Sequence, residues 1–135
     1  RKMLILGRDS GNVLEMDDIS IQRILPEACM NASTVAAFYE ELEKADSHFE
    51  AMKQAAEKEG KVLRYIGILE NGAVSIRLEA VDHTHPFYSL SGSDNIIAFT
   101  TSRYKQRPLV VKGPGAGAEV TAAGVFADLV KVGSR

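Results

Sequence analysis

A glycine-rich segment near the end of the chain has the composition of a ligand-binding loop. The stretch KGPGAGAEVTAAGVFADLVK runs from Lys112 to Lys131 and follows a short apolar segment. Gly113, Gly115 and Ala118 match the spacing G-x-G-x-x-A of a dinucleotide-binding turn, in which a glycine loop joins a strand to a helix. Glycines permit positive φ angles and a close backbone approach, and a helix N-terminus attracts negative charge.

The sequence after this loop does not continue as a dinucleotide-binding fold would. That fold needs a second strand, with an acidic residue about 20 residues beyond the first glycine. Position 133 is Gly133, and the sequence ends at Arg135. We therefore exclude the first turn of a Rossmann domain. Spacing alone leaves two interpretations open: a tight strand-to-helix turn, or an accessory wall in which residues 115–117 approach a ligand held mainly by another domain.

Two further places hold residues that could do chemistry. In DHTHP, His83 and His85 are two residues apart, which on a strand would put both rings on one face, as some metal sites need. The neighbouring Pro86 and the lack of an obvious third ligand favour a solvated turn, and no metal is predicted. Cys29 has no histidine near it in sequence, so we expect a small buried hydrophobe rather than a catalytic thiol.

The composition is that of a soluble globular protein of one domain or a large piece of one. The 135 residues are 45% hydrophobic and 25% charged, with a formal net charge of −2. With no Lys/Arg cluster on a predicted element, we expect neither nucleic acid nor a membrane surface as a partner. No apolar run approaches the ~18 residues that span a membrane. The single cysteine suits a reducing compartment, and we expect the cytoplasm.

The start of the chain lacks an initiator Met, which leads us to expect a truncated fragment. The apolar run that follows is expected to end a helix at Gly11. Alternation of apolar and polar residues predicts a strand at residues 19–25. An apolar stripe predicts a helix at residues 33–44, supported by a Glu40–Lys44 pair. A second helix is expected to begin with a capping box, Ser47 and Glu50, and to end at Gly60.

The second half of the sequence predicts a sheet. Asn71-Gly72 joins two alternating segments, KVLRYIGIL and AVSIRLEAV, and is a strong hairpin signal because both residues tolerate positive φ. We expect Leu63, Tyr65 and Ile68 to share a face opposite Val74, Ile76 and Leu78. Further strands are predicted at residues 95–102 and 109–112. The fold class is therefore α+β: a mainly antiparallel sheet, two packed helices and a C-terminal helix after the glycine-rich loop.

The segment PLVVKGPGAGAEVTAAGVFADL, residues 108–129, closely resembles the C-terminal motif of homoserine dehydrogenases. The resemblance extends through HPFYSLSGSDNIIAFTTSRY and EGKVLRYIG and covers nearly the whole chain. It is most similar to the dehydrogenase part of bifunctional aspartokinase/homoserine dehydrogenases. The resemblance implies that residues 1–112 are the second part of the catalytic and dimerisation domain. Residues 113–135 would be the loop and closing helix that return to a nucleotide-binding domain absent from this chain.

The resemblance also implies an activity and its residues. Members of this family interconvert L-aspartate 4-semialdehyde and L-homoserine with NAD or NADP as cofactor, on the route to threonine and methionine. The family's cofactor-contacting glycine falls on Gly117, with Gly115 and Ala116 as further candidates. Arg1-Lys2 matches the end of a family motif, so Lys2 falls on the catalytic lysine, which resembles a proton donor to the nascent alkoxide.

The resemblance further implies a small-molecule substrate and a homodimer. We expect the 135-residue chain alone to be inactive, because half of the cleft lies outside it. The alternative function is a stand-alone dimerisation or regulatory α+β module without catalysis.

Overall fold

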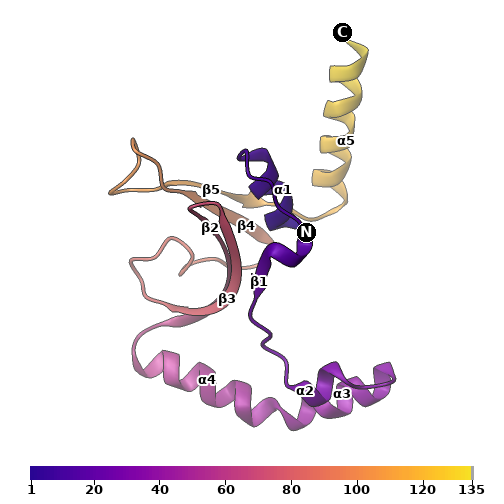
Figure 1. Ribbon diagram of the computed structural model, residues 1–135, viewed down its shortest axis with the longest axis vertical. Coiled ribbons are helices and arrows are strands. Elements are labelled where there is room, and N and C mark those ends of the chain that lie inside the picture. The colour runs from indigo at the N-terminus through magenta and orange to yellow at the C-terminus, as the bar shows by residue number, and fades with distance from the viewer. Residues whose placement is uncertain (135) are drawn as a thin grey trace. The chain divides into compact units, whose positions relative to one another are not determined.

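The computed structural model describes residues 1–134 and divides the chain into two compact units, Arg1–Asp82 and a second unit beginning at His83. The first unit contains α1 (Lys2–Asp9), η1 (Met16–Asp18), β1 (Ile19–Ile21), α2 (Glu27–Met30), α3 (Val35–Lys44), α4 (Asp46–Lys58), β2 (Val62–Glu70) and β3 (Ala73–Val81). The second contains β4 (Asp94–Phe99), β5 (Leu109–Pro114) and α5 (Ala118–Gly133) (Figure 1). The predicted α+β class is confirmed.

The β2–β3 hairpin is the centre of the first unit. Its strands pair antiparallel from Val62↔Val81 to Glu70↔Ala73, and β1 pairs parallel to β3, which gives the strand order β1-β3-β2. The two-residue turn has positive φ at Asn71 (51°) and Gly72 (79°). Two positive φ angles give a turn whose twist matches that of the flanking strands, and this fixes the register. The predicted hairpin is confirmed.

Strand β1 is shorter than the predicted residues 19–25 because of hydrogen bonds made by Gln22. The backbone N–H of Gln22 still donates to the Ile76 carbonyl at 2.8 Å, as in a parallel ladder. The next ladder donor, Leu78 N–H, binds Gln22 Oε1 at 2.9 Å instead of a backbone carbonyl. The freed Gln22 carbonyl accepts from Tyr65 Oη at 2.8 Å. The Gln22 side chain thus replaces its own backbone carbonyl as the acceptor for Leu78 N–H, and β1 ends here.

One face of this sheet packs against α1. Val74 lies in the buried cluster with Leu14 and Ile19, and the partly buried side chains around it are Met3, Leu4, Leu69 and Ile76. Two glycines permit the close approach: a Cβ on Gly67 would lie 2.6 Å from Met3 Cγ, and one on Gly7 would lie 2.5 Å from Leu14 Cδ1. Gly67 pairs with Ile76 and so lies on this face, where we had placed Ile68 from the sequence.

The placement of Ile68 on the face of Leu63 and Tyr65 is wrong. Ile68 pairs with Ser75, one position out of phase with the Tyr65–Leu78 pair. Successive side chains of a strand point to opposite faces, so Ile68 shares its face with Ile66. Ile68 lies three residues after Tyr65, and an odd separation along a strand puts two side chains on opposite faces.

Helices α3 and α4 meet at a single residue, Ala45. Thr34 caps α3, with its hydroxyl accepting from Ala37 N–H at 3.1 Å. Ala45 closes α3 and is also the N-cap of α4, which makes no side-chain cap. The predicted Ser47–Glu50 capping box is therefore wrong, because Ser47 lies inside the first turn and Glu50 instead accepts from Gln54 Nε2 at 3.0 Å.

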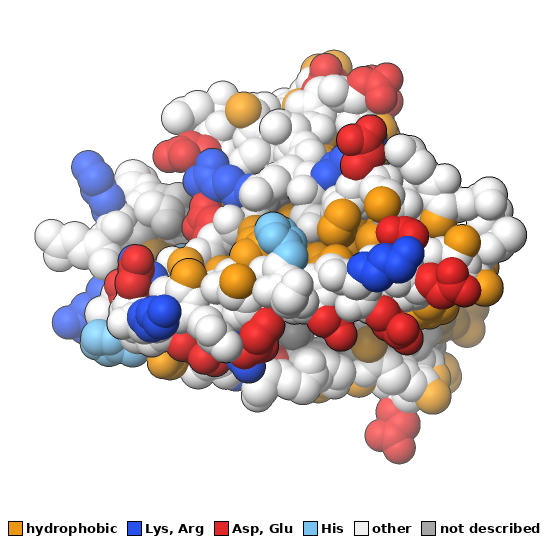
Figure 2. Space-filling model, turned by 90° about the horizontal axis from the view of Figure 1, so that it is seen from below, with side chains coloured by type: hydrophobic (Ala, Val, Ile, Leu, Met, Phe, Trp, Pro, Cys, Tyr) orange, Lys and Arg blue, Asp and Glu red, His pale blue; other side chains and the backbone are white. Residues whose placement is uncertain are grey.

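The predicted Glu40–Lys44 pair is replaced by another on the same helix. Lys44 Nζ lies 2.6 Å from Glu41 Oε1, at i,i+3 spacing. The apolar stripe of α3 is only half covered, since Phe38 is partly buried and Val35 and Tyr39 are exposed. The face drawn in Figure 2, seen from below, shows apolar side chains interspersed with acidic and basic ones.

Two exposed ion pairs shift pKa values in this region. The hydrogen bond to Glu41, together with its charge, raises the pKa of Lys44. The hydrogen bond between Lys61 and Glu59, together with their mutual attraction, lowers the pKa of Glu59 and raises that of Lys61. The contribution of a lowered carboxyl pKa is lost as the pH falls through the folded value, and that of a raised lysine pKa is lost as the pH rises through it. Water screens these surface groups, so we expect both contributions to be small.

The second unit is built on the antiparallel pair β4–β5, which runs from Asp94↔Pro114 to Phe99↔Leu109. This pair is a separate two-stranded sheet, so the predicted antiparallel pairs exist but lie in two sheets rather than one. The loop from residue 100 to 108 joins the strands, and α5 follows β5 after three residues. Within residues 1–134, none of the helices has the length and apolar character that crossing a membrane requires.

Replacing Val74 by Ala is expected to lower the free energy of unfolding by about 2 kcal/mol, because two buried methyl groups are lost and leave a cavity. Val74 is 2% exposed, whereas Val13 is 99% exposed and provides the matched control. For Val13→Ala we expect a change within about 0.5 kcal/mol. Urea unfolding followed by circular dichroism measures both, and equal values would contradict a core built around Val74.

Candidate functional site

The glycine loop consists of residues 115–117, between the end of β5 and the start of α5. Gly117 is the N-cap of α5, with φ 126° and ψ 154°. This backbone region is open essentially to glycine alone. Apart from Gly117 itself and its two chain neighbours, no heavy atom of residues 1–134 lies within 4 Å of the position that a Cβ on Gly117 would take, and all three loop residues are exposed. The loop therefore presents bare backbone toward open space at the start of a helix.

At Gly115 a steric requirement, rather than a positive φ angle, favours glycine. Its φ lies outside the left-handed region, but the side chain of Asn95 occupies the space of a Cβ. A Cβ there would lie 2.6 Å from Asn95 Cγ and 3.3 Å from Asn95 Cβ, and closer still to Nδ2. Asn95 belongs to β4 and pairs with Gly113, two residues before Gly115. Side chains reach such diagonal neighbours across an antiparallel pair.

The glycine loop is uncharged, and the charged residues lie on either side of it. Residues 113–118, GPGAGA, carry no charged side chain. At the base of the loop Lys112 Nζ lies 3.6 Å from Asp94 Oδ2. Glu119 stands in the first turn of α5, where its carboxylate interacts favourably with the helix dipole. That carboxylate would also repel a phosphate at the same helix end, so the loop suits a neutral ring or amide better than a phosphate.

Helix α5 carries large apolar side chains that remain at the surface. Each of its residues is exposed, including Phe126 at 66% and Leu129 at 65%. Val125, Leu129 and Val132 follow one another at helical spacings of four and three, so they form one stripe. Apolar stripes of this kind are normally covered by another surface.

Lys2 belongs to the other unit. It is the first residue of α1, and its side chain is exposed. With the rest of the described chain, residues 1–134, this ammonium forms neither a hydrogen bond nor an ion pair. Gly115, Ala116 and Gly117 are thus brought together in one loop, and Lys2 stands at the start of a helix in the first unit.

The histidine segment forms a turn, as the sequence favoured. His85 Nδ1 accepts from the backbone N–H of Phe87 at 3.1 Å, and the two rings meet edge to face with centroids 5.0 Å apart. Within residues 1–134, no three His, Cys, Asp or Glu side chains are grouped so as to hold a metal ion. Cys29 is 2% exposed, which confirms the buried thiol.

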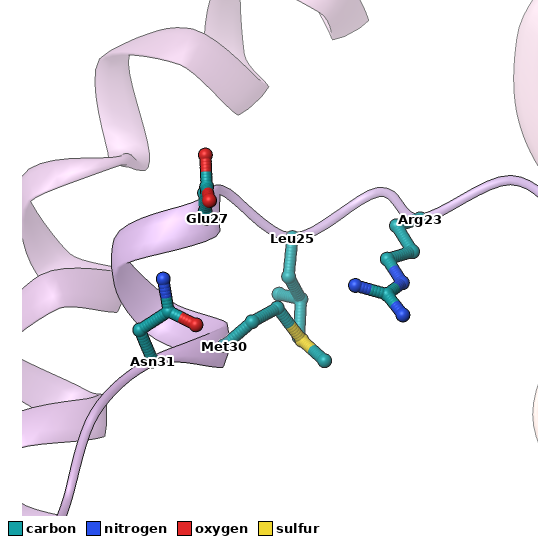
Figure 3. A pocket seen from close by; sticks show the side chains of 5 residues that line it. All are labelled: Arg23, Leu25, Glu27, Met30 and Asn31. Atoms are coloured by element: carbon teal, nitrogen blue, oxygen red, sulfur yellow. The ribbon is translucent and has the colours of Figure 1, made fainter.

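Two surface hollows are formed by other parts of the chain, and neither is lined by a predicted site residue. One, of about 290 Å³, lies beside α2 and is lined by Arg23, Leu25, Glu27, Met30 and Asn31 (Figure 3). Leu25 and Met30 project into the same space, with the Arg23 guanidinium beside them. The other, of about 440 Å³, is formed by residues 102–107 of the β4–β5 loop.

The fold is shared with known structures. A crystal structure of a Candida auris protein of unknown function superposes with a TM-score of 0.87 at 40% identity, over 99% of this chain and 38% of that one. The chain therefore shares its fold with part of a longer protein.

Sequence comparison identifies the family. The family model described as homoserine dehydrogenase matches residues 1–130. The chain belongs to the homoserine dehydrogenase family. It is 47% identical over 136 residues to the chloroplastic bifunctional aspartokinase/homoserine dehydrogenase 2 of Zea mays, covering 99% of this chain and 15% of the relative. It is 45% identical over 138 residues to homoserine dehydrogenase of Schizosaccharomyces pombe, covering 100% of this chain and 37% of the relative.

Alanine is expected to change the stability of the protein in opposite directions at Gly117, in the loop, and at Gly124, in the helix. Gly124 lies within α5, and beyond its own helix backbone no atom of the described residues lies within 4 Å of its Cβ position. Gly124→Ala should therefore stabilise by about 0.5–1 kcal/mol through helix propensity. Gly117→Ala should destabilise by about 1–3 kcal/mol because alanine must adopt φ 126°. Thermal unfolding of the complete protein measures both. Equal shifts in the same direction would contradict the conformation of Gly117.

Proposed function

We propose that this chain is part of an enzyme that interconverts L-aspartate 4-semialdehyde and L-homoserine with NAD(P)H. The main structural support is the exposed glycine loop, in which Gly117 faces open space and adopts a conformation that favours glycine. Membership of the homoserine dehydrogenase family supports the reaction. The family uses NAD or NADP, and both a bifunctional and a monofunctional relative match the chain at similar identity.

The chain would contribute two parts of this enzyme. Residues 1–112 would form the second part of the catalytic and dimerisation domain. Residues 113–135 would form a loop and closing helix that return to a nucleotide-binding domain outside this chain. The exposed apolar stripe of α5 supports this proposal, because such a stripe needs a covering surface. The chain also spans only 37% of the S. pombe relative, which leaves room for such a domain.

The residues of the loop fit a nicotinamide cofactor. Gly115, Ala116 and Gly117 present no side chain larger than a methyl group, so a flat ring could lie against their backbone. When bound, the cofactor supplies the hydride chemistry. Lys2 would donate a proton from its ammonium group to the substrate oxygen as that oxygen gains negative charge. Its exposed side chain, without an ion-pair partner among residues 1–134, is free for this task.

We further propose that the enzyme is a homodimer and acts in the cytoplasm on a small-molecule substrate. The exposed apolar side chains of β4 and β5, including Phe99 and Val111, support an association surface. The single, buried Cys29 is in keeping with a reducing compartment. The maize relative is described as chloroplastic, so a plastid is the other compartment to test.

The activity is tested by comparing this chain with the complete protein. We expect the complete protein to oxidise homoserine with NADP or NAD, and the 135-residue chain to show no turnover because it lacks most of the cofactor surface. Absorbance at the wavelength of the reduced nicotinamide measures both. Turnover by the chain alone would contradict the proposed division of the site. If the complete protein shows no turnover, the proposed dehydrogenase function is contradicted.

Substituting Gly117 tests the loop in the complete protein. A Val side chain would stand where the ring must approach, and a displacement of about 1 Å can reduce the rate on the order of a hundredfold. Both Gly117→Ala and Gly117→Val bear the backbone strain, but only valine adds bulk. We expect Gly117→Val to raise the cofactor KM or lower kcat well beyond Gly117→Ala. Equal kinetic damage would indicate a purely conformational role, and wild-type behaviour of both would refute the site.

A further inference from the structure

Asn95 is an exposed polar side chain of β4 that lies against the glycine loop. It is the second residue of β4, and asparagine is depleted in strands because it packs poorly on a pleated surface. Its side chain crosses diagonally to Gly115 and fills the space above that α-carbon. The result is an amide group held against the glycine loop by a residue distant from it in sequence.

This amide has unused hydrogen-bonding capacity. A primary amide offers two N–H donors and an oxygen with two lone pairs. Throughout residues 1–134, no side chain or backbone group forms a hydrogen bond with the Asn95 side chain. Asn95 is exposed, so water can satisfy it in the absence of a ligand. A ligand lying against the loop could replace that water with a direct hydrogen bond.

The surroundings select the chemistry of that ligand group. Asn95 is neutral, and residues 113–118 carry no charge. The nearby Lys112 is already paired with Asp94, and the carboxylate of Glu119 disfavours a phosphate. A neutral group with both a carbonyl oxygen and an N–H donor suits this position, because it matches the donors and acceptor of the asparagine amide.

We propose that Asn95 contacts the cofactor by hydrogen bonding to the carboxamide of its nicotinamide ring. This inference rests on the proposed function, in which residues 115–117 lie against that ring. Gly115 then has a defined role: it leaves the space through which the Asn95 amide reaches the ligand side of the loop. Gly115→Ala would displace the amide and is expected to weaken cofactor binding in the same way as loss of Asn95.

The test measures cofactor binding by the complete protein, with NADPH and NADH titrated separately through their fluorescence. Asn95→Leu removes the amide at similar volume, and Asn95→Asp removes its donors. We expect each to raise the Kd of the preferred cofactor about five- to tenfold, the effect of one lost hydrogen bond. Asn31→Leu is the matched control, because Asn31 is an exposed amide far from the loop in sequence, and its Kd should equal that of the wild type.

Cofactor analogues separate a direct contact from a change in loop shape. In thionicotinamide and 3-acetylpyridine analogues, sulfur replaces the carboxamide oxygen or a methyl group replaces its amino group. Competition against the reduced cofactor should show that the wild type discriminates against at least one analogue, and that Asn95→Leu loses this discrimination. Unchanged discrimination in Asn95→Leu would overturn the proposal, even if the variant binds more weakly or melts earlier.

Three other outcomes are also decisive. If the Asn95 variants keep the wild-type cofactor Kd while Gly117→Val weakens binding, the Asn95 contact is refuted and the proposed function stands. If Gly117→Val also leaves the Kd unchanged, the placement of the loop against the cofactor fails. A rise in the KM for homoserine with an unchanged cofactor Kd would likewise overturn the proposal, by assigning the amide to the substrate.

Discussion

The backbone conformation of Gly117 sets the direction in which the chain leaves β5 and enters α5. At φ 126° and ψ 154°, the peptide turns in a region that side chains with a Cβ avoid, and α5 begins at the next residue. The start of α5 directly after an exposed loop depends on this one turn. Asn95 adds a second constraint, because its side chain occupies the space that a Cβ at residue 115 would take.

Local signals in the sequence predicted the elements whose cause is local. Asn71-Gly72 specified the hairpin because its two positive φ angles are a property of those two residues. The glycine loop followed by an apolar, alanine-rich segment predicted α5 for the same kind of reason. The α+β class followed from these elements and from the helical stripes between them. The sequence resemblance to homoserine dehydrogenases is confirmed by the family match over residues 1–130, and it is the basis of the proposed function, which periodicity alone left open.

The predictions from the sequence failed where residues distant in the sequence determine where a strand or helix begins or ends. Strand β1 ends early because Gln22 binds Leu78 and Tyr65, which lie 56 and 43 residues away. Ser47 matched a capping pattern, but α3 and α4 share Ala45, and this junction moved the helix start. Within the proposed site, the resemblance pointed to Gly117 and that assignment stays a prediction, whereas the position of Asn95 over Gly115 could not be predicted because it depends on the register of β4 and β5. An asparagine opening a predicted strand, against a glycine-rich strand end, was the available signal.

The central claim is that residues 115–117 and the start of α5 face a bound nicotinamide cofactor. Hydrogen–deuterium exchange of the complete protein tests it directly, because the backbone amides at the start of α5 lie at an exposed helix end and should exchange readily without ligand. The claim predicts that saturating reduced cofactor slows exchange in peptides covering residues 113–121, while the β2–β3 turn at residues 71–72 is unaffected. Identical exchange of residues 113–121 with and without cofactor would contradict it.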